Sequence, residues 1–186
     1  MVSAAFILAL LPQSVGWLQY DRSAILSAQL WRLFTGHWIH FSMSHLLYDA
    51  GAVGIAGWII EQNRRPDFKW YCLLAPWVIG LACFIFAPRM EFYGGLSGIA
   101  TGLLVYMALQ GLRERTAWRW ICTAILCSVP LKIYCESTAG QTLFASGMDQ
   151  HIAVCITSHV AGALSALGWV TMVNCQKTFR LRNVPC

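Results

Sequence analysis

The chain has 186 residues, of which 58% are hydrophobic and only 11% are charged, whereas soluble domains normally carry about 25% charged residues. This composition excludes an ordinary soluble domain and favours a membrane protein. The formal net charge is +5, and the placement of basic residues around membrane spans explains that excess without a nucleic-acid partner.

Six apolar segments are long enough, or nearly so, to be membrane spans, because about 20 residues of helix cross the hydrocarbon layer. In chain order they cover residues 2–20, 41–60, 70–87, 92–112, 120–131 and 152–173. The fifth is short and needs flanking residues to complete a crossing. We therefore expect an all-α, polytopic membrane protein, a six-helix bundle that forms one domain over residues 1–186. A cleaved signal peptide is an alternative for residues 4–11, although the segment lacks a basic start.

The distribution of Lys and Arg predicts the orientation, because cytoplasmic loops are enriched in these residues. With the N-terminus in the cytoplasm, the inner loops and the C-terminal tail hold nine of the 13 basic residues. The outer loops hold the other four, which are Arg22, Arg32, Arg89 and Lys132. We expect both termini to be cytoplasmic.

The eight cysteines form no CxxC pair and lie mostly within the predicted spans, which is typical of small packing residues. Cys135 and Cys155 are both expected toward the outer side, where a disulfide between them is an open alternative. We expect no metal and no cofactor.

Three spans carry polar residues at one predicted depth. The second, fourth and sixth spans all run from outside to inside in this topology. His45 and Asp49 lie about four and eight residues into the second, Ser97 about five into the fourth and His159 about seven into the sixth, roughly 6 to 12 Å below the outer surface. Ionisable side chains inside a bilayer usually face a bundle interior or a wet cavity and serve a function. We therefore expect a polar site that opens outward.

Small residues allow helices to approach closely in a membrane, and on the fourth and sixth spans they are Gly98, Gly102, Gly162, Ala163 and Ala166. A close approach would bring His159 within hydrogen-bond reach of Ser97, and an imidazole at about 3 Å can take the proton of a serine nucleophile. The backbone N–H of Ser97 and the side chain of His45 are candidate oxyanion donors. Taken alone, each residue also fits a structural role.

At these residues the sequence resembles the rhomboid family of intramembrane serine proteases. The family's GxSG motif is matched by Gly95-Leu96-Ser97-Gly98, and its sixth-helix motif by SHVAGALSA, residues 158–166, which contains Gly162. The resemblance implies that Ser97 is the nucleophile, that His159 is the general base and that His45 belongs to the oxyanion hole. It also implies a rhomboid-like fold of six transmembrane helices.

Further motifs extend the resemblance from about residue 31 to residue 168. The WR signature of the first outer loop is matched by Trp31 and Arg32, and the GxxxE at the cytoplasmic end of the second helix by Gly57 and Glu61. We expect the catalytic core to span about residues 31–173.

Two positions depart from the family pattern. Asp49 stands where the family has an asparagine that donates to the oxyanion, and Thr101 where a tyrosine often packs on the base. Because an ionised carboxylate would repel the oxyanion, we expect Asp49 to be protonated, and so able to donate, or turned away. No other carboxylate is expected near the imidazole of His159, so a two-residue catalytic unit of Ser97 and His159 is predicted.

Within the family, the short chain and the sequence LKIYCE, residues 131–136, resemble the rhombosortase subgroup. This resemblance implies exported bacterial substrates whose C-terminal anchor, a Gly-Gly motif followed by a hydrophobic helix and basic residues, is cut on the periplasmic side of the inner membrane. Glycine suits such a cut because it weakens a helix by about 1 kcal/mol relative to alanine. The expected partners are transmembrane proteins with a glycine-rich cleavage region, together with membrane lipids.

Two other functions stay open from the sequence. A rhomboid-like protein that binds transmembrane segments without cutting them would fit the presence of Asp49, although Ser97 and His159 are both retained. A metal site or transporter would use the histidines of one stretch that lacks an HExxH motif, His37, His40 and His45.

Overall fold

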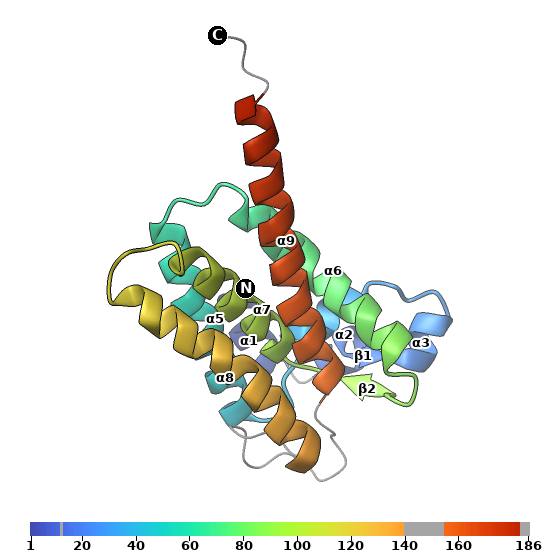
Figure 1. Ribbon diagram of the computed structural model, residues 1–186. Coiled ribbons are helices and arrows are strands. Elements are labelled where there is room, and N and C mark those ends of the chain that lie inside the picture. Colours follow the sequence, from blue (N-terminus) through green and yellow to red (C-terminus); the bar gives the residue numbers. More distant parts are fainter. Residues whose placement is uncertain (12, 140–154, 183–186) are drawn as a thin grey trace.

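The computed structural model describes residues 1–11, 13–139 and 155–182 and is a bundle of helices (Figure 1). Its long helices are α5 (Met43–Gln62), α6 (Phe68–Phe86), α7 (Ser97–Gly111), α8 (Trp118–Ala139) and α9 (Ile156–Arg182). Among the described residues, three helices are long and apolar enough to cross a membrane, namely α5, α6 and α9, and α7 is a shorter apolar helix. The expectation of a helical, integral membrane protein is confirmed, and three of the six predicted spans have a helix of spanning length and composition.

The first predicted span, residues 2–20, is not one helix. It contains α1 (Val2–Ala9) and α2 (Ser14–Leu18), which are eight and five residues long. A proline at position 12 disfavours helical backbone at the residue before it. An eight-residue helix rises about 12 Å, which is less than half of the hydrocarbon thickness. The chain then continues through three short helices, α3 (Arg22–Leu26), α4 (Arg32–Thr35) and η1 (Gly36–Trp38).

The fourth predicted span, residues 92–112, begins as a strand. β2 (Phe92–Tyr93) pairs antiparallel with β1 (Tyr20–Asp21), with Tyr20 opposite Tyr93. Gly95 follows with φ of +132°, a backbone conformation that interrupts a right-handed helix and that side chains rarely adopt. Helix α7 therefore begins at Ser97, so that serine is the first residue of its helix and not the fifth residue of a helical span.

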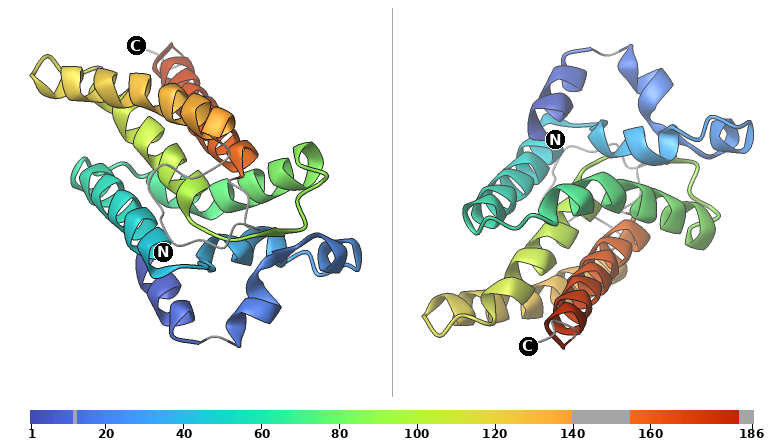
Figure 2. Two further views of the ribbon diagram at one scale, coloured as in Figure 1. Left: turned by 90° about the horizontal axis from the view of Figure 1, so that it is seen from below. Right: turned by 90° about the horizontal axis from the view of Figure 1, so that it is seen from above.

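Helix α7 lies in the centre of the bundle, where it packs against α5, α6, α8 and α9. Eleven of its 15 residues are buried. Figure 2 shows α7 among the other long helices, with the N-terminal residues on the side away from α8 and α9. A short helix without a polar face is stable here because protein surrounds it.

The predicted glycine contact between the fourth and sixth spans is present between α7 and α9. A Cβ on Gly98 would lie 2.9 Å from the carbonyl oxygen of Ser158, and a Cβ on Gly162 would overlap the carbonyl of Gly98. Ala166, one turn further along α9, is fully buried. The absence of side chains at these glycines lets the two backbones touch.

Helix α8 is longer than the predicted fifth span, residues 120–131. It has 22 residues and continues to Ala139, so Lys132 lies inside the helix and not in an outer loop. The helix tolerates Pro130 in its interior, and the charges at Lys132 and Glu136 pair with each other. The span predicted from the sequence is too short because these two charges resemble the end of an apolar segment.

The contact of Cys155 differs from the pairing considered from the sequence. Its sulfur lies 3.5 Å from that of Cys83 on α6, and both residues are free cysteines. Cys135 instead lines the cavity described below. The contact therefore connects the beginning of α9 to α6, not to α8.

Candidate active site

A cavity of about 390 Å³ lies among α5, α7, α8 and α9, and it brings together the four polar residues that the sequence places at one depth. Its wall includes His45 and Asp49 from α5, Ser97 from α7, Lys132 and Glu136 from α8, and His159 from α9. Most other wall residues are apolar side chains of α5, α7 and α8. The arrangement is a group of polar side chains in the wall of an otherwise mostly apolar cavity inside the helix bundle.

Ser97 is placed by the turn that precedes it. Because α7 starts at Ser97, the first amides of the helix have no intrahelical acceptor and point toward the region before the helix. Gly95 is required for space as well as for its positive φ, since a Cβ there would lie 2.6 Å from Cε1 of His45. The missing side chain lets the His45 ring approach the turn that carries Ser97.

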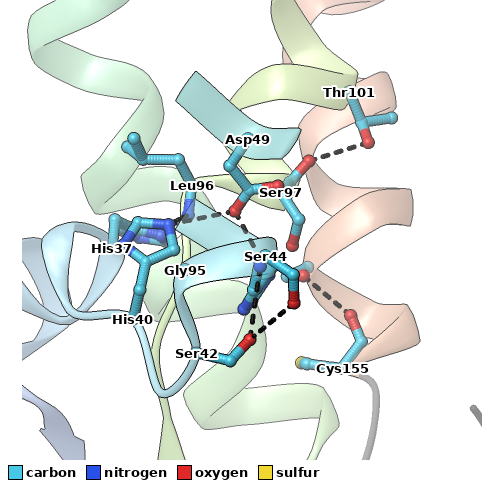
Figure 3. A network of polar contacts seen from close by, with 12 residues as sticks. His37, His40, Ser42, Ser44, Asp49, Gly95, Leu96, Ser97, Thr101 and Cys155 are labelled. Atoms are coloured by element: carbon cyan, nitrogen blue, oxygen red, sulfur yellow. Dashed lines mark hydrogen bonds and ion pairs between the residues drawn. The ribbon is translucent and has the colours of Figure 1, made fainter. Parts of the chain in front are cut away.

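His159 is brought to the same cavity by the contact between the backbones of α7 and α9. Ser97 and His159 each neighbour a residue of that contact, since Gly98 meets Ser158. His159 is 2% exposed and lies in the first turn of α9. The hydroxyl of Thr101, the fifth residue of α7, donates to the carbonyl of Ser97 at 2.8 Å (Figure 3), so it is bonded to its own helix.

The imidazole of His159 has a carboxylate partner that the sequence does not predict. Its Nδ1 lies 2.9 Å from Oε2 of Glu136. Glu136 also accepts from Lys132 Nζ, at 2.8 Å to Oε1 and 2.7 Å to Oε2. The expectation that no carboxylate other than Asp49 is near the imidazole of His159 is therefore wrong. The sequence does contain one indication of this carboxylate. Lys132 and Glu136 are four residues apart, so in a helix they lie on one face and can pair within an apolar region.

The carboxyl group of Asp49 contacts two histidines, His40, which Figure 3 labels, and His45. Its Oδ2 lies 3.2 Å from Nε2 of His40 and 3.2 Å from Nε2 of His45. The Nδ1 of His40 lies 3.2 Å from the carbonyl oxygen of Trp38, and the N–H of Leu96 donates to His40 Nε2 at 3.3 Å. His40 thus connects Asp49 to the residue just before Ser97, a role that the sequence does not reveal.

His45 has a second ring nitrogen that is free to act. Its Nδ1 is buried and has no hydrogen-bond partner among the residues that the structure describes. The side chain itself is only 8% exposed. A buried imidazole nitrogen without a partner is costly, and this one belongs to a ring in the cavity wall.

The three histidines considered for a metal site do not act as one cluster. His37 lies outside the spans in η1, where burial lowers its pKa to about 4, so its ring is neutral. Its Nε2 is 2.9 Å from the carbonyl oxygen of Pro76, to which it donates. Within the described ranges, no group of three or more His, Cys, Asp or Glu side chains is arranged to hold a metal ion.

The remaining motif residues lie away from the cavity wall. Arg32 is buried and donates to the carbonyl oxygens of Gly16 and Gln19 at 2.8 and 2.9 Å. The indole of Trp31 donates to the carbonyl of Trp17 at 3.2 Å. Trp31 and Arg32 therefore connect α2 and the residue after it to the start of α4. Glu61 is exposed near the end of α5.

Comparison with known proteins gives the same relationship as the motifs. The rhomboid domain family matches residues 27–174. The chain belongs to the rhomboid family. It is 29% identical over 101 residues to the rhomboid protease GlpG of Salmonella newport, Salmonella heidelberg and Salmonella typhi, an alignment that covers 53% of this chain. The aligned part is 35% of each relative, so this chain matches about a third of their length.

Proposed function

We propose that this rhomboid-family protein is an intramembrane serine endopeptidase. The observation that supports this function best is that Ser97 and His159 line one cavity and that a carboxylate holds the far nitrogen of His159. With Nδ1 of His159 occupied, Nε2 is the nitrogen that takes the Ser97 proton while Oγ attacks the scissile carbonyl. The proton then passes to the leaving amine, and water hydrolyses the acyl-enzyme.

The oxyanion of this reaction needs donors that are in place beforehand. The amide of Ser97 at the start of α7 and the ring of His45 are the proposed donors. His40 donates from Nδ1 to the carbonyl of Trp38 and accepts the N–H of Leu96 at Nε2, which also lies 3.2 Å from Oδ2 of Asp49. We propose that the buried Asp49 carboxyl group is protonated during the reaction. A protonated Asp49 carries no charge that would repel the oxyanion.

The proposed substrates are transmembrane proteins, because the cavity wall is mostly apolar and lies among the helices of the bundle. Cleavage there requires an extended peptide, so the backbone hydrogen bonds of a substrate helix must first be released. A Gly-Gly pair lowers that cost and leaves the carbonyl sterically open. The proposed substrate is therefore the Gly-Gly anchor of an exported bacterial protein. The proposed location is the inner membrane, with six spans, cytoplasmic termini and the site open to the periplasm.

A reporter protein that ends in Gly-Gly, a hydrophobic helix and basic residues tests the proposal in cells that express the enzyme. Wild type should release the reporter, Ser97→Ala should release none, and a Leu-Leu reporter should stay anchored. Ser27→Ala, at an exposed serine outside the cavity, is the control and should behave as wild type. A fluorophosphonate should label purified wild type at Ser97. If wild type neither releases the reporter nor reacts with the fluorophosphonate, the protein binds transmembrane segments without cutting them.

A further inference from the structure

Glu136 connects Lys132 and His159 in the wall of the cavity. Its side chain is 1% exposed, and that of His159 is 3% exposed. The ammonium of Lys132 lies within 2.8 Å of both carboxylate oxygens. A buried carboxylate is costly unless it is paired and hydrogen-bonded. Lys132 supplies the opposite charge and fixes the plane of the carboxylate, so that Oε2 faces the imidazole.

The distances around His159 decide which ring nitrogen carries the proton. Nδ1 lies 2.9 Å from Oε2 of Glu136 and 3.4 Å from Nζ of Lys132. A carboxylate only accepts and an ammonium only donates. Because the carboxylate oxygen is nearer, Nδ1 is the donor and carries the hydrogen. Nε2 then has a free lone pair, which is the state that a general base requires.

We propose that Glu136 is a positioning residue that holds His159 in the Nδ1–H tautomer and stabilises its protonated form, with Lys132 holding the carboxylate. The proposal rests on the proposed roles of Ser97 and His159. When Nε2 takes the serine proton, the ring becomes an imidazolium and Nδ1 keeps its hydrogen. Glu136 stays ionised and compensates the new positive charge. The catalytic unit thus depends on three helices, α7, α8 and α9.

The first test compares kcat and KM of purified variants on the Gly-Gly reporter. Glu136→Gln keeps the shape of the side chain and removes its charge, so kcat should fall by about 10²- to 10⁴-fold with little change in KM. Lys132→Met combined with Glu136→Gln leaves no unpaired cation and should show the same loss. Ser137→Ala, at the exposed neighbour of Glu136, should match wild type. The rate of fluorophosphonate labelling at Ser97 should fall in parallel with kcat.

The pH profile separates a positioning role from general damage. A carboxylate stabilises a protonated imidazole. Without Glu136, the ring of His159 should therefore lose its proton at lower pH, and the acidic limb of the kcat/KM profile should move to lower pH. The unpaired Lys132 of the single variant acts in the same direction, and the double variant removes that effect. The other titratable or nucleophilic groups of the described cavity wall, His45, Tyr48, Asp49, Ser97 and Cys135, are unchanged in every variant.

A measurement on wild type reads the tautomer directly and needs the His159→Gln variant only to assign the signal. In the ¹⁵N spectrum of histidine-labelled protein, the signal lost in His159→Gln should show a protonated Nδ1 and a bare Nε2 above the acidic limb. An Nε2–H tautomer would overturn the proposal, as would wild-type kcat in both Glu136 variants or a loss of kcat with an unmoved limb. None of these results contradicts the proposed role of Ser97 as nucleophile. That proposal is contradicted only if the wild-type protein does not cleave the reporter.

Discussion

The proposed mechanism requires that the carboxyl group of Asp49 does not repel the oxyanion. Its Oδ2 has imidazole nitrogens of His40 and His45 at 3.2 Å each. His40 in turn accepts from the amide of Leu96, next to Ser97. This network fixes the position of the Asp49 carboxyl group relative to the start of α7.

We predict that Asp49→Asn preserves or raises activity. The amide has the shape of the protonated carboxyl group and carries donors of its own, so kcat/KM should be at least that of wild type. Asp49→Leu removes the polar partner of both imidazoles, and kcat should fall by about 10²-fold, the usual cost of losing one oxyanion donor. Kinetics on the Gly-Gly reporter measure both variants. An inactive Asp49→Asn would mean that the ionised carboxylate is needed, most directly to hold His45.

The meeting of four polar residues at one cavity is the part of this candidate site that the sequence predicts. Ser97, His45, Asp49 and His159 stand out because an ionisable or hydroxyl group inside a span needs a reason. The sequence does not predict Glu136, because the apolar segment of the fifth span covers residues 120–131 and its completing residues reach 134 at most. Two further turns of helix carry Glu136 back over the cavity, and only the contacts between α8 and α9 show that it faces His159.

The element that sets the geometry of the site is the start of α7. An apolar segment beginning at residue 92 predicts a helix from that point, but residues 92–93 pair with the strand that contains Tyr20. That pairing is between residues more than 70 positions apart in the chain, and no local pattern reports it. Gly95 then turns the chain with a positive φ, and Ser97 becomes the first residue of the helix. The helix-start amides beside Ser97, which have no intrahelical acceptor, therefore result from tertiary structure.

We predict that the backbone contact between α7 and α9 requires a glycine at position 162, whereas a glycine elsewhere in α9 is not required. A Cβ at Gly162 would overlap the carbonyl of Gly98, so Gly162→Ala should push the helices apart and cost about 1–3 kcal/mol. Gly168, on the same helix, has open space among the described atoms around a Cβ position. Gly168→Ala should leave stability equal or raise it by up to about 1 kcal/mol, because alanine favours the helix.

Thermal unfolding in detergent and reporter cleavage measure this pair of variants together. Gly162→Ala should lower both the midpoint of unfolding and kcat, since Ser97 and His159 lie next to the contact. Equal midpoints for the two variants would show that the backbones of α7 and α9 are not in contact in the membrane protein.

At the scale of the whole molecule, the two ends of the bundle differ in chemistry. The cavity lies at the end where α7 and α9 begin and α8 finishes. At the other end, Asp67 accepts from Tyr106 at 2.6 Å and from Trp169 at 3.2 Å, and so joins α6, α7 and α9. Arg64, Arg65 and Lys69 surround Asp67 in the sequence. A basic loop at the end away from the site predicts that the cavity faces the periplasm.

We predict that two cysteine substitutions, at exposed positions expected on opposite sides of the membrane, will report this orientation. Ser27→Cys lies in the segment expected outside, and Gln62→Cys ends α5 beside the basic loop. Intact spheroplasts treated with a membrane-impermeant maleimide should be labelled at position 27 and not at position 62, and inside-out vesicles should give the reverse. Mass spectrometry locates the labelled peptide, so the native cysteines can stay in place. Labelling of position 62 from outside would show that the bundle has the opposite orientation in the membrane. The proposed cleavage of exported anchors would then lose its basis, because the cavity would open to the cytoplasm, where those Gly-Gly segments do not lie.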